Sequence, residues 1–307
     1  MTEAGGLEAA LPAGATTRFA PAPTGRLHLG HLANAIFVWG LARRAGGRVL
    51  LRIEDHDQQR CRPEYEAALL DDLDRLGIAP DEPSTDDFRR GPTPHRQSDN
   101  GDAYAAAVDG LRARALAYAC DCSRSTFDAW QSANGRAWSG AGCPAGCRDR
   151  RLVEAPGMTL RVALGDGDES WVDVLRGPSS GPATPAGDLA IRDRNNNWTY
   201  GLCVVVDDLR HGVDLVVRGE DLLDATPAQI RLGRLLGRDS QPTFAHHRLV
   251  RRSDGTKLSK AGSATALGER LDAGRSPEEL IGEATRAVGL SPVDRPITFD
   301  EALALVP

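Results

Sequence analysis

The sequence predicts an α/β fold in which a parallel sheet is interrupted by an inserted, cysteine-bearing segment. Three observations predict it: a strand–loop–helix–strand pattern over residues 16–55, further apolar segments that end in charged residues between 200 and 237, and four clustered cysteines in between. The length of 307 residues allows about two domains, and 41% hydrophobic residues are ample for a core.

The first unit contains the segment 18–31, with the sequence Arg-Phe-Ala-Pro-Ala-Pro-Thr-Gly-Arg-Leu-His-Leu-Gly-His. Its prolines and glycines predict a strand end, a tight loop and a helix start. The free N–H groups and positive dipole of such a helix start favour an anion, and His28 and His31, which flank Gly30, add donors to the same face. A plain surface loop would explain the turn but not this placement of the histidines, so we expect a phosphate site here.

The next elements complete a βαβ unit. Apolar residues recur at helical spacing over 30–44, and the short apolar run 49–55 predicts a buried parallel strand. Ligands of such sheets bind at the carboxyl ends of strands, so Glu54 is expected near the phosphate site. Pro63 opens a further amphipathic helix, which Gly77 ends.

An inserted domain is expected where this pattern loosens. Residues 80–96 are rich in Pro, Asp and Arg and predict a linker, and a helix over 99–118 leads from it to the cysteines. Alternating residues over 159–173 predict a small antiparallel element within the insertion. We therefore expect the insertion to span residues 85–199.

Six cysteines are present, and four of them form a pattern typical of a metal site. They are arranged as Cys-x-Cys, twenty intervening residues and Cys-x3-Cys, with glycines around the second pair. In a reducing cytosol disulfides are disfavoured, whereas two close thiolate pairs can complete a tetrahedral zinc shell. We therefore expect one structural Zn²⁺ per chain rather than reduced spectator thiols. Its ligands would be Cys120, Cys122, Cys143 and Cys147.

The chain then returns to the first domain. The buried run 202–206 and the apolar segment 213–221 predict two further strands, and the second carries Arg218 at its carboxyl end, beside the expected pocket. Thr226 is expected to cap the next helix, which Gly237 ends. The first domain would comprise residues 16–84 and 200–237, after a flexible tail at 1–15 and before a C-terminal helical region at 238–307.

Lysine usage marks one further element. Of 37 basic residues only two are lysines, Lys257 and Lys260, and both lie in the tetrapeptide Lys-Leu-Ser-Lys. A compact ammonium on a flexible stem suits phosphates that shift during a reaction, whereas a planar guanidinium prefers a fixed partner. The tetrapeptide therefore indicates a second phosphate-binding element.

The segment 18–31 resembles the first signature of class I aminoacyl-tRNA synthetases, in the version carried by the glutamyl and glutaminyl members. Lys-Leu-Ser-Lys resembles their second signature, and the resemblance runs from about Arg18 to about Gly262, closest to a shortened branch of the glutamyl members. It implies a Rossmann-type class I synthetase catalytic domain with a zinc-containing insertion and a small C-terminal helical region. The clustered cysteines match the family's zinc position.

The resemblance also implies roles for individual residues. The glutamate site would be lined by Arg18, Ala20, Ala22, Glu54, Tyr200 and Arg218. ATP would be bound by His28, Gly30, His31 and Lys260, and catalysis would involve His28, His31, Lys257 and Lys260. Three positions depart from the family pattern, since Ala22 and Gly201 replace a serine and an asparagine, and Cys143 stands where some members have a tyrosine ligand.

The implied reaction is the ATP-dependent activation of L-glutamate, with Mg²⁺ travelling with ATP, and transfer to queuosine at the first anticodon position of tRNA(Asp). Only 47 residues follow Lys260, so we expect no anticodon-binding domain and expect the anticodon stem-loop itself to reach the active site. Three alternatives stay open: a glutamyl-tRNA synthetase acting on an ordinary tRNA 3′ end, a nucleotidyltransferase that shares the His-x-Gly-His loop, and a non-catalytic paralogue that binds tRNA or zinc.

Charge and hydropathy limit the partners. The formal net charge of −6 excludes a uniformly basic nucleic-acid-binding protein, so an RNA has to meet local patches such as the arginines at 148, 150 and 151. No apolar run approaches the length of about 20 residues that a membrane span needs, and the N-terminus lacks the pattern of a signal peptide. We expect a cytoplasmic monomer without membrane contact.

Overall fold

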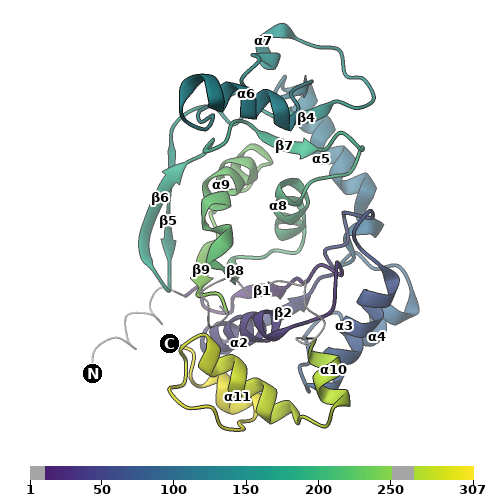
Figure 1. Cartoon of the computed structure of the whole chain (residues 1–307), viewed down its shortest axis with the longest axis vertical. Helices are drawn as coiled ribbons and strands as arrows, with labels where there is room; N and C mark the ends of the chain where they lie inside the picture. Colours follow the sequence, from purple (N-terminus) through teal and green to yellow (C-terminus); the bar gives the residue numbers. More distant parts are fainter. Residues whose placement is uncertain (1–10, 251–265) are drawn as a thin grey trace.

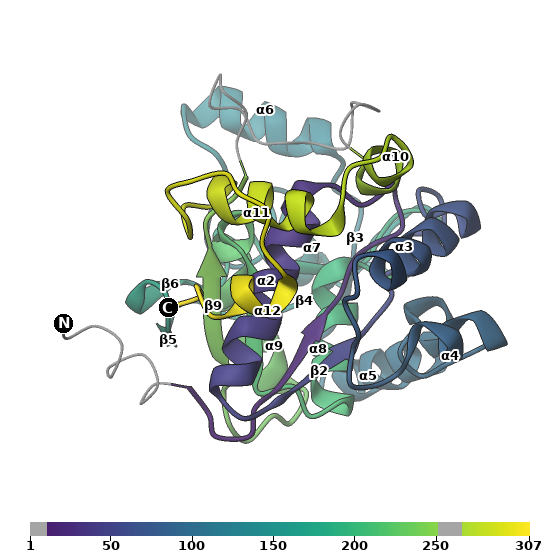
Figure 2. The ribbon, with the colours of Figure 1, turned by 90° about the horizontal axis from the view of Figure 1, so that it is seen from below.

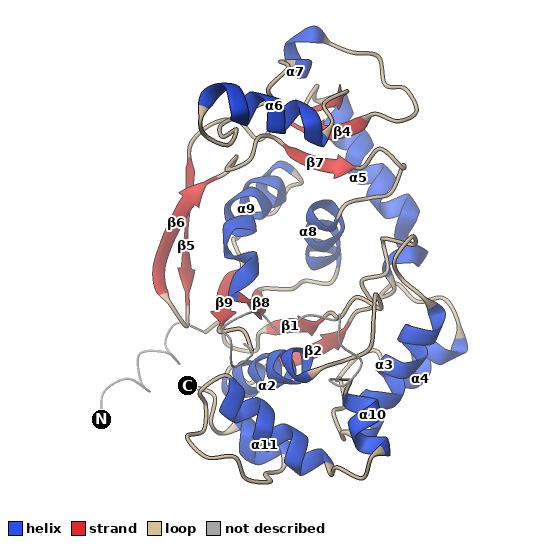
Figure 3. Ribbon diagram, in the orientation of Figure 1, coloured by secondary structure: helices blue, strands red, loops and turns tan. Residues whose placement is uncertain are grey.

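The computed structural model describes residues 11–250 and 266–307 (Figure 1). Figure 3 distinguishes its helices from its strands. The strands are β1 (Thr16–Phe19), β2 (Arg48–Leu51), β3 (Ala117–Cys120), β4 (Thr159–Val162), β5 (Asp168–Asp173), β6 (Gly177–Pro182), β7 (Leu189–Arg192), β8 (Leu215–Gly219) and β9 (Thr243–His247). The helices are α2 (Leu29–Arg44), α3 (Pro63–Arg75), α4 (Thr85–Arg90), α5 (Gly101–Ala113), α6 (Arg124–Asn134), α7 (Cys147–Arg150), α8 (Tyr200–Arg210), α9 (Thr226–Leu235), α10 (Leu267–Asp272), α11 (Pro277–Ala287) and α12 (Phe299–Leu303), with 3-10 turns at η1 (Gln97–Asn100) and η2 (Glu220–Ala225).

The strands form three hydrogen-bonded sheets. Strands β1 and β2 pair in parallel above α2 in the view of Figure 1, and a second sheet has the order β6-β5-β9-β8. The backbone N–H of Asp214 donates to the carbonyl of Thr16 at 3.1 Å, which places β8 beside β1. The antiparallel sheet β3-β4-β7 lies at the opposite end of the molecule. The carboxyl ends of β1 and β8 therefore lie next to each other.

Helix α2 lies at the centre of the largest apolar core. It confirms the helix expected over 30–44, and the strand expected over 49–55 is present as the shorter β2. Side chains such as those of Ile36 and Leu41 are fully buried. The helices α11 and α12 cover α2 on the side away from β1 and β2 (Figure 2). The core thus fixes the start of α2 relative to the ends of the parallel strands.

Two expectations for strands are wrong. The buried run 202–206 lies in helix α8, where all its residues belong to an apolar cluster that α5, α9 and β7 share. A run buried on every side shows no helical periodicity, and its β-branched residues favour a strand in sequence. The element expected over 159–173 is split between two sheets, because Gly165 and Gly167 adopt positive φ angles of 75° and 102° and turn the chain between β4 and β5.

Two further segments differ in extent. The helix expected over 99–118 ends at Ala113, because Ala115 takes a positive φ of 55° and the chain continues as β3. The linker expected at 80–96 contains helix α4, which begins at a capping box between Ser84 and Asp87. A six-residue helix is too short to show periodicity in sequence, although its cap residues were visible.

The described chain begins within the core. We expected residues 1–15 to form a tail, but Leu11 and Ala15 are buried. The N–H of Gly14 donates to the carbonyl of Ala45 at 2.7 Å, so this segment packs on the end of α2. Residues 11–15 therefore belong to the folded domain.

The C-terminal region expected to be helical at 238–307 is helical only from α10 onward, because it begins with β9 (Thr243–His247), a strand of the second sheet. A capping box between Ser276 and Glu279 begins α11. No helix among the described residues is long and apolar enough to cross a membrane. The tetrapeptide with Lys257 and Lys260 lies outside the described residues.

Candidate active site

One cavity of about 620 Å³ opens where α2 begins, at the carboxyl ends of β1 and β8. Its walls come from segments far apart in the sequence: the loop between β1 and α2, the residues after β2, the start of α8 and the end of β8. All the described residues that we expected to bind glutamate or ATP line this cavity. They are Arg18, Ala20, Ala22, His28, Gly30, His31, Glu54, Tyr200 and Arg218.

Two histidines build the α2 end of the cavity. His28 is the N-cap of α2, and its Nδ1 accepts from the N–H of Gly30 at 3.0 Å, while Nδ1 of His31 accepts from the N–H of His28 at 3.1 Å. Each neutral ring therefore carries its proton on Nε2. A side chain on Gly30 would bring its Cβ to 2.9 Å from the ring of His28, so any larger residue here would displace that ring. Helix dipole and imidazole N–H groups together suit an anion.

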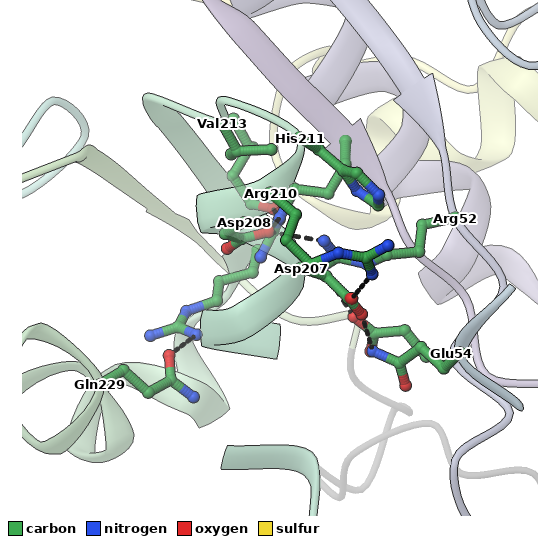
Figure 4. A network of polar contacts seen from close by, with 12 residues as sticks. Arg52, Glu54, Asp207, Asp208, Arg210, His211, Val213 and Gln229 are labelled. Atoms are coloured by element: carbon green, nitrogen blue, oxygen red, sulfur yellow. Dashed lines mark hydrogen bonds and ion pairs between the residues drawn. The ribbon is translucent and has the colours of Figure 1, made fainter. Parts of the chain in front are cut away.

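A network of buried charges holds Arg18 and Glu54 in the wall (Figure 4). Arg52 donates to Asp208 Oδ1 at 2.7 Å and to Glu54 Oε1 at 3.0 Å, and Arg18 donates to the same oxygen of Asp208 at 3.0 Å. Burial opposes ionisation of Asp208, but Arg18 and Arg52 outweigh it and lower the pKa of this carboxyl. The charges of the network therefore compensate one another.

Arg218 is held by uncharged partners. Its Nε donates to Nε2 of His246 at 3.0 Å, its Nη1 to Oε1 of Gln229 at 2.6 Å and its Nη2 to the hydroxyl of Thr226 at 2.8 Å. Burial lowers the pKa of Arg218, and among the described residues no carboxylate is hydrogen-bonded to it. A buried cation offset by dipoles alone is completed by an anionic ligand, for which a carboxylate has the matching geometry.

Thr226 does not cap α9, contrary to our expectation. The N-cap is Ala225, which makes no side-chain cap, and Thr226 lies in the first turn with its hydroxyl turned to Arg218. A hydrogen bond to a buried charged group is worth more than an exposed cap, so the tertiary contact decides the conformation. The phenol of Tyr200 also contacts Arg218, and burial raises the pKa of Tyr200.

Sequence reasoning missed four residues that support this wall from behind: Arg52, Asp208, Gln229 and His246. Two of them left a signal. Arg52 interrupts an otherwise apolar run, and His246 ends a short apolar segment just as Glu54 does. Asp208 was not identified because the run before it was predicted to be a strand, whereas both lie in helix α8.

The four expected zinc ligands converge on β3 and α7. Their sulfur atoms all lie within 4.8 Å of one another, and all four side chains are buried. The Sγ atoms of Cys122 and Cys147 are 3.7 Å apart. This distance matches the edge of about 3.8 Å in a tetrahedron with Zn–S bonds of about 2.3 Å. Arg161 donates to Sγ of Cys120 at 3.3 Å and adds positive charge beside the thiols, so the donor set fits zinc.

The chain matches the model of the family described as "tRNA synthetases class I (E and Q), catalytic domain" over residues 15–300. It is 40% identical to the glutamyl-Q tRNA(Asp) synthetase of Symbiobacterium thermophilum, over 93% of this chain and 90% of that protein. The glutamyl-Q tRNA(Asp) synthetase of Rhodobacter capsulatus is 38% identical, over 89% of this chain and 99% of that protein. The glutamate–tRNA ligase of Frankia casuarinae is also 38% identical, but the chain spans only 53% of its length.

A solved structure agrees with these relatives. The glutamate-tRNA synthetase from Elizabethkingia anophelis superposes with a TM-score of 0.75 at 27% identity, over 94% of this chain and 65% of that one. The resemblance inferred from the two signatures is thereby confirmed. The chain belongs to the class I tRNA synthetases of the E and Q type.

Proposed function

We propose that this chain activates L-glutamate with ATP and transfers it to queuosine at the first anticodon position of tRNA(Asp). The observation that carries the proposal is that all the described residues expected for glutamate and ATP line a single cavity. The two glutamyl-Q tRNA(Asp) synthetases that the chain matches over 90% and 99% of their lengths support the choice of acceptor.

Glutamate would bind between the two buried arginine groups of the cavity. Arg218, with its uncharged partners, would take one carboxylate, and Arg18 the other. Glu54 would take the α-ammonium, and Tyr200 would add a hydroxyl contact. Ala22 lines the same cavity and offers no hydrogen bond from its side chain.

Activation requires no nucleophilic side chain. The α-carboxylate of glutamate would attack the α-phosphorus of ATP, and pyrophosphate would leave with its Mg²⁺. The N-terminus of α2, with His28 and His31, would stabilise the charge on the phosphate oxygens. Lys257 and Lys260 would follow the migrating phosphates, although both lie outside the described residues.

Transfer would use a hydroxyl of the cyclopentenediol of queuosine, which attacks the carbonyl of the glutamyl adenylate and releases AMP. The exposed arginines 148 and 151, on and after α7, are candidates for contacts with tRNA phosphates. Because the chain carries a net charge of −6, binding would depend on such local patches and weaken steeply with salt.

Two assays test this function. Glutamate-dependent exchange of pyrophosphate into ATP should proceed without tRNA. Glutamate should then be transferred to tRNA(Asp) that contains queuosine, and neither to tRNA(Asp) with guanosine at that position nor to tRNA(Glu). Charging of the 3′ end of tRNA(Glu) would instead support the second candidate, an ordinary glutamyl-tRNA synthetase, which the match to the Frankia casuarinae ligase favours.

We further propose that the cysteine cluster, Cys120, Cys122, Cys143 and Cys147, holds one structural zinc ion. The ion would stabilise the fold around β3 and α7 and take no part in the reaction. Elemental analysis of protein purified without chelator should find about one zinc per chain. Full zinc retention in a Cys143→Ala, Cys147→Ala double variant would contradict this assignment.

A further inference from the structure

Three buried side chains form a row across neighbouring strands behind the cavity. In the parallel pair of β8 and β9, Arg218 lies opposite His246. Strand β5 joins the other side of β9 with Asp173 opposite Phe244. The register of the sheet alone therefore places Asp173, His246 and Arg218 near one another.

The hydrogen bonds along this row run in one direction. Nδ1 of His246 lies 2.5 Å from Oδ2 of Asp173, and Nε2 of His246 accepts from Nε of Arg218 at 3.0 Å. A carboxylate only accepts hydrogen bonds, so Nδ1 carries the proton of the imidazole. Nε2 is then left with the lone pair that the N–H of Arg218 requires. The opposite tautomer would set two N–H groups against each other.

The surroundings favour this arrangement, since the hydroxyl of Thr226, 3.1 Å from Nε2 of His246, can donate to the same lone pair. Asp173 and His246 are each 1% exposed, and Oδ1 of Asp173 accepts from the backbone N–H of Leu175 at 3.1 Å. The ring of Phe244 stacks on His246, with centroids 5.9 Å apart and planes 11° apart, and lies 5.6 Å from the guanidinium of Arg218. Burial lowers the pKa of His246, which favours the neutral ring.

We propose that Asp173 and His246 are positioning residues for Arg218: they fix the imidazole tautomer that holds the guanidinium toward the carboxylate of the substrate. This inference rests on the proposed function, in which Arg218 binds a carboxylate of glutamate. Neither Asp173 nor His246 is among the residues that line the cavity, so both act through Arg218. Of the five N–H groups of a guanidinium, three are occupied by His246, Gln229 and Thr226, which sets the plane in which the others point.

The isosteric variant Asp173→Asn tests the tautomer. The backbone N–H of Leu175 needs an oxygen, so the new amide NH₂ must face Nδ1 of His246 and move the ring proton to Nε2, against Arg218. In pyrophosphate exchange with the full chain, KM for glutamate should rise about tenfold or more, the loss expected for a hydrogen bond to a charged group. KM for ATP should change less than about twofold, because the substitution does not alter the anion site at the start of α2.

Two variants of the histidine separate its two contacts. His246→Gln keeps an acceptor near the position of Nε2, and its KM for glutamate should stay within about threefold of wild type. The shorter side chain in His246→Asn reaches only the position of Nδ1, so the hydrogen bond from Arg218 is lost. KM for glutamate should therefore rise as in Asp173→Asn. His211→Gln, a substitution of a histidine that does not line the cavity, is the matched control and should leave both KM values unchanged.

A spectroscopic measurement is independent of activity. Long-range ¹H–¹⁵N spectra of the histidine rings should report the proton of His246 on Nδ1 in the wild type and on Nε2 in Asp173→Asn, with unchanged circular dichroism. The same tautomer in both proteins, or equal rises of both KM values, would overturn the positioning role. A wild type with the expected tautomer but no glutamate-dependent exchange would instead refute the proposed function.

Discussion

The cavity wall contains two groups of buried arginines that differ in how their charge is compensated. Arg18 and Arg52 share the carboxylate of Asp208, and Arg52 also pairs with Glu54. Arg218, equally buried, is surrounded by an amide, a hydroxyl and an imidazole. The first group is electrically complete within the folded chain. In the second, no carboxylate of the described residues is hydrogen-bonded to the guanidinium, and Asp173 reaches it only through His246.

This difference separates a framework from a binding group. Ion pairs that are buried and mutually satisfied cost little to keep and much to break, since a lone partner is left charged in a poor solvent. A buried cation that has no direct carboxylate partner gains from an anionic ligand. Substitution of Arg52, which does not line the cavity, should therefore affect mainly stability, whereas substitution of Arg218 should affect mainly affinity.

The largest expected effect is on stability. Arg52→Met keeps the side-chain volume but leaves Glu54 without its buried cation, and Asp208 with Arg18 alone. The free energy of unfolding in urea should fall by about 3–5 kcal/mol, the usual cost of breaking a buried pair on one side. The matched variant Arg218→Met should fall by no more than about 1 kcal/mol, because only neutral groups lose a partner. Equal losses in the two variants would refute the distinction between the two groups.

The next effect is on affinity. Arg218→Met should raise KM for glutamate about a hundredfold or more, since it removes a charged hydrogen-bond fork from the cavity. Arg218→Lys should recover part of this loss, because an ammonium keeps the charge but not the planar fork. Both are measured by pyrophosphate exchange, with KM for ATP as the internal control. An unchanged KM for glutamate in Arg218→Met would contradict the assignment of Arg218 to a carboxylate.

The outline of this site could be predicted from the sequence because its parts are local. The loop before α2 is specified by its own prolines, glycines and histidines, and Glu54 and Arg218 stand where apolar strands end. The rule that ligands bind at the carboxyl ends of parallel strands then brings them together. The cysteine cluster was equally local, since its two pairs are close in sequence.

The support behind the site could not be predicted, because it joins distant residues. Arg52 and Asp208 are 156 positions apart, and Asp173 and His246 are 73 apart. The spacing of apolar residues carries no information on such contacts. The helix α8 was also mistaken for a strand, and this error concealed that Asp208 faces β1 and β2. The local sequence pattern thus predicts which side chains contact the ligand. The tertiary structure determines which of these side chains already have an ionic partner within the protein.

The smallest predicted effect concerns the protonation of His95 and His211, two histidines that the charge of Arg52 influences. His95 and His211 stack with ring centroids 4.2 Å apart, and no carboxylate of the described residues hydrogen-bonds either ring. Burial lowers the pKa of both imidazoles, that of His211 to about 3, and the charge of Arg52 acts in the same direction.

The sign of the pH effect follows from this lowered pKa. An unfolded chain protonates its histidines below about pH 6.5, whereas the folded chain resists until lower pH, so stability is present above pH 6.5 and is lost as the pH falls. The histidine contribution to the free energy of unfolding should therefore decrease between pH 7 and pH 5. Asp72, whose pKa burial raises to about 6, titrates in the same range but is common to wild type and variant. His211→Gln, which can still donate to the carbonyl of Pro94, should reduce that decrease by about 1 kcal/mol, less than full linkage because the ring is partly accessible. An identical pH dependence in wild type and variant would mean that the stacked pair is already charged in the folded protein, and that Arg52 is not the cation that opposes it.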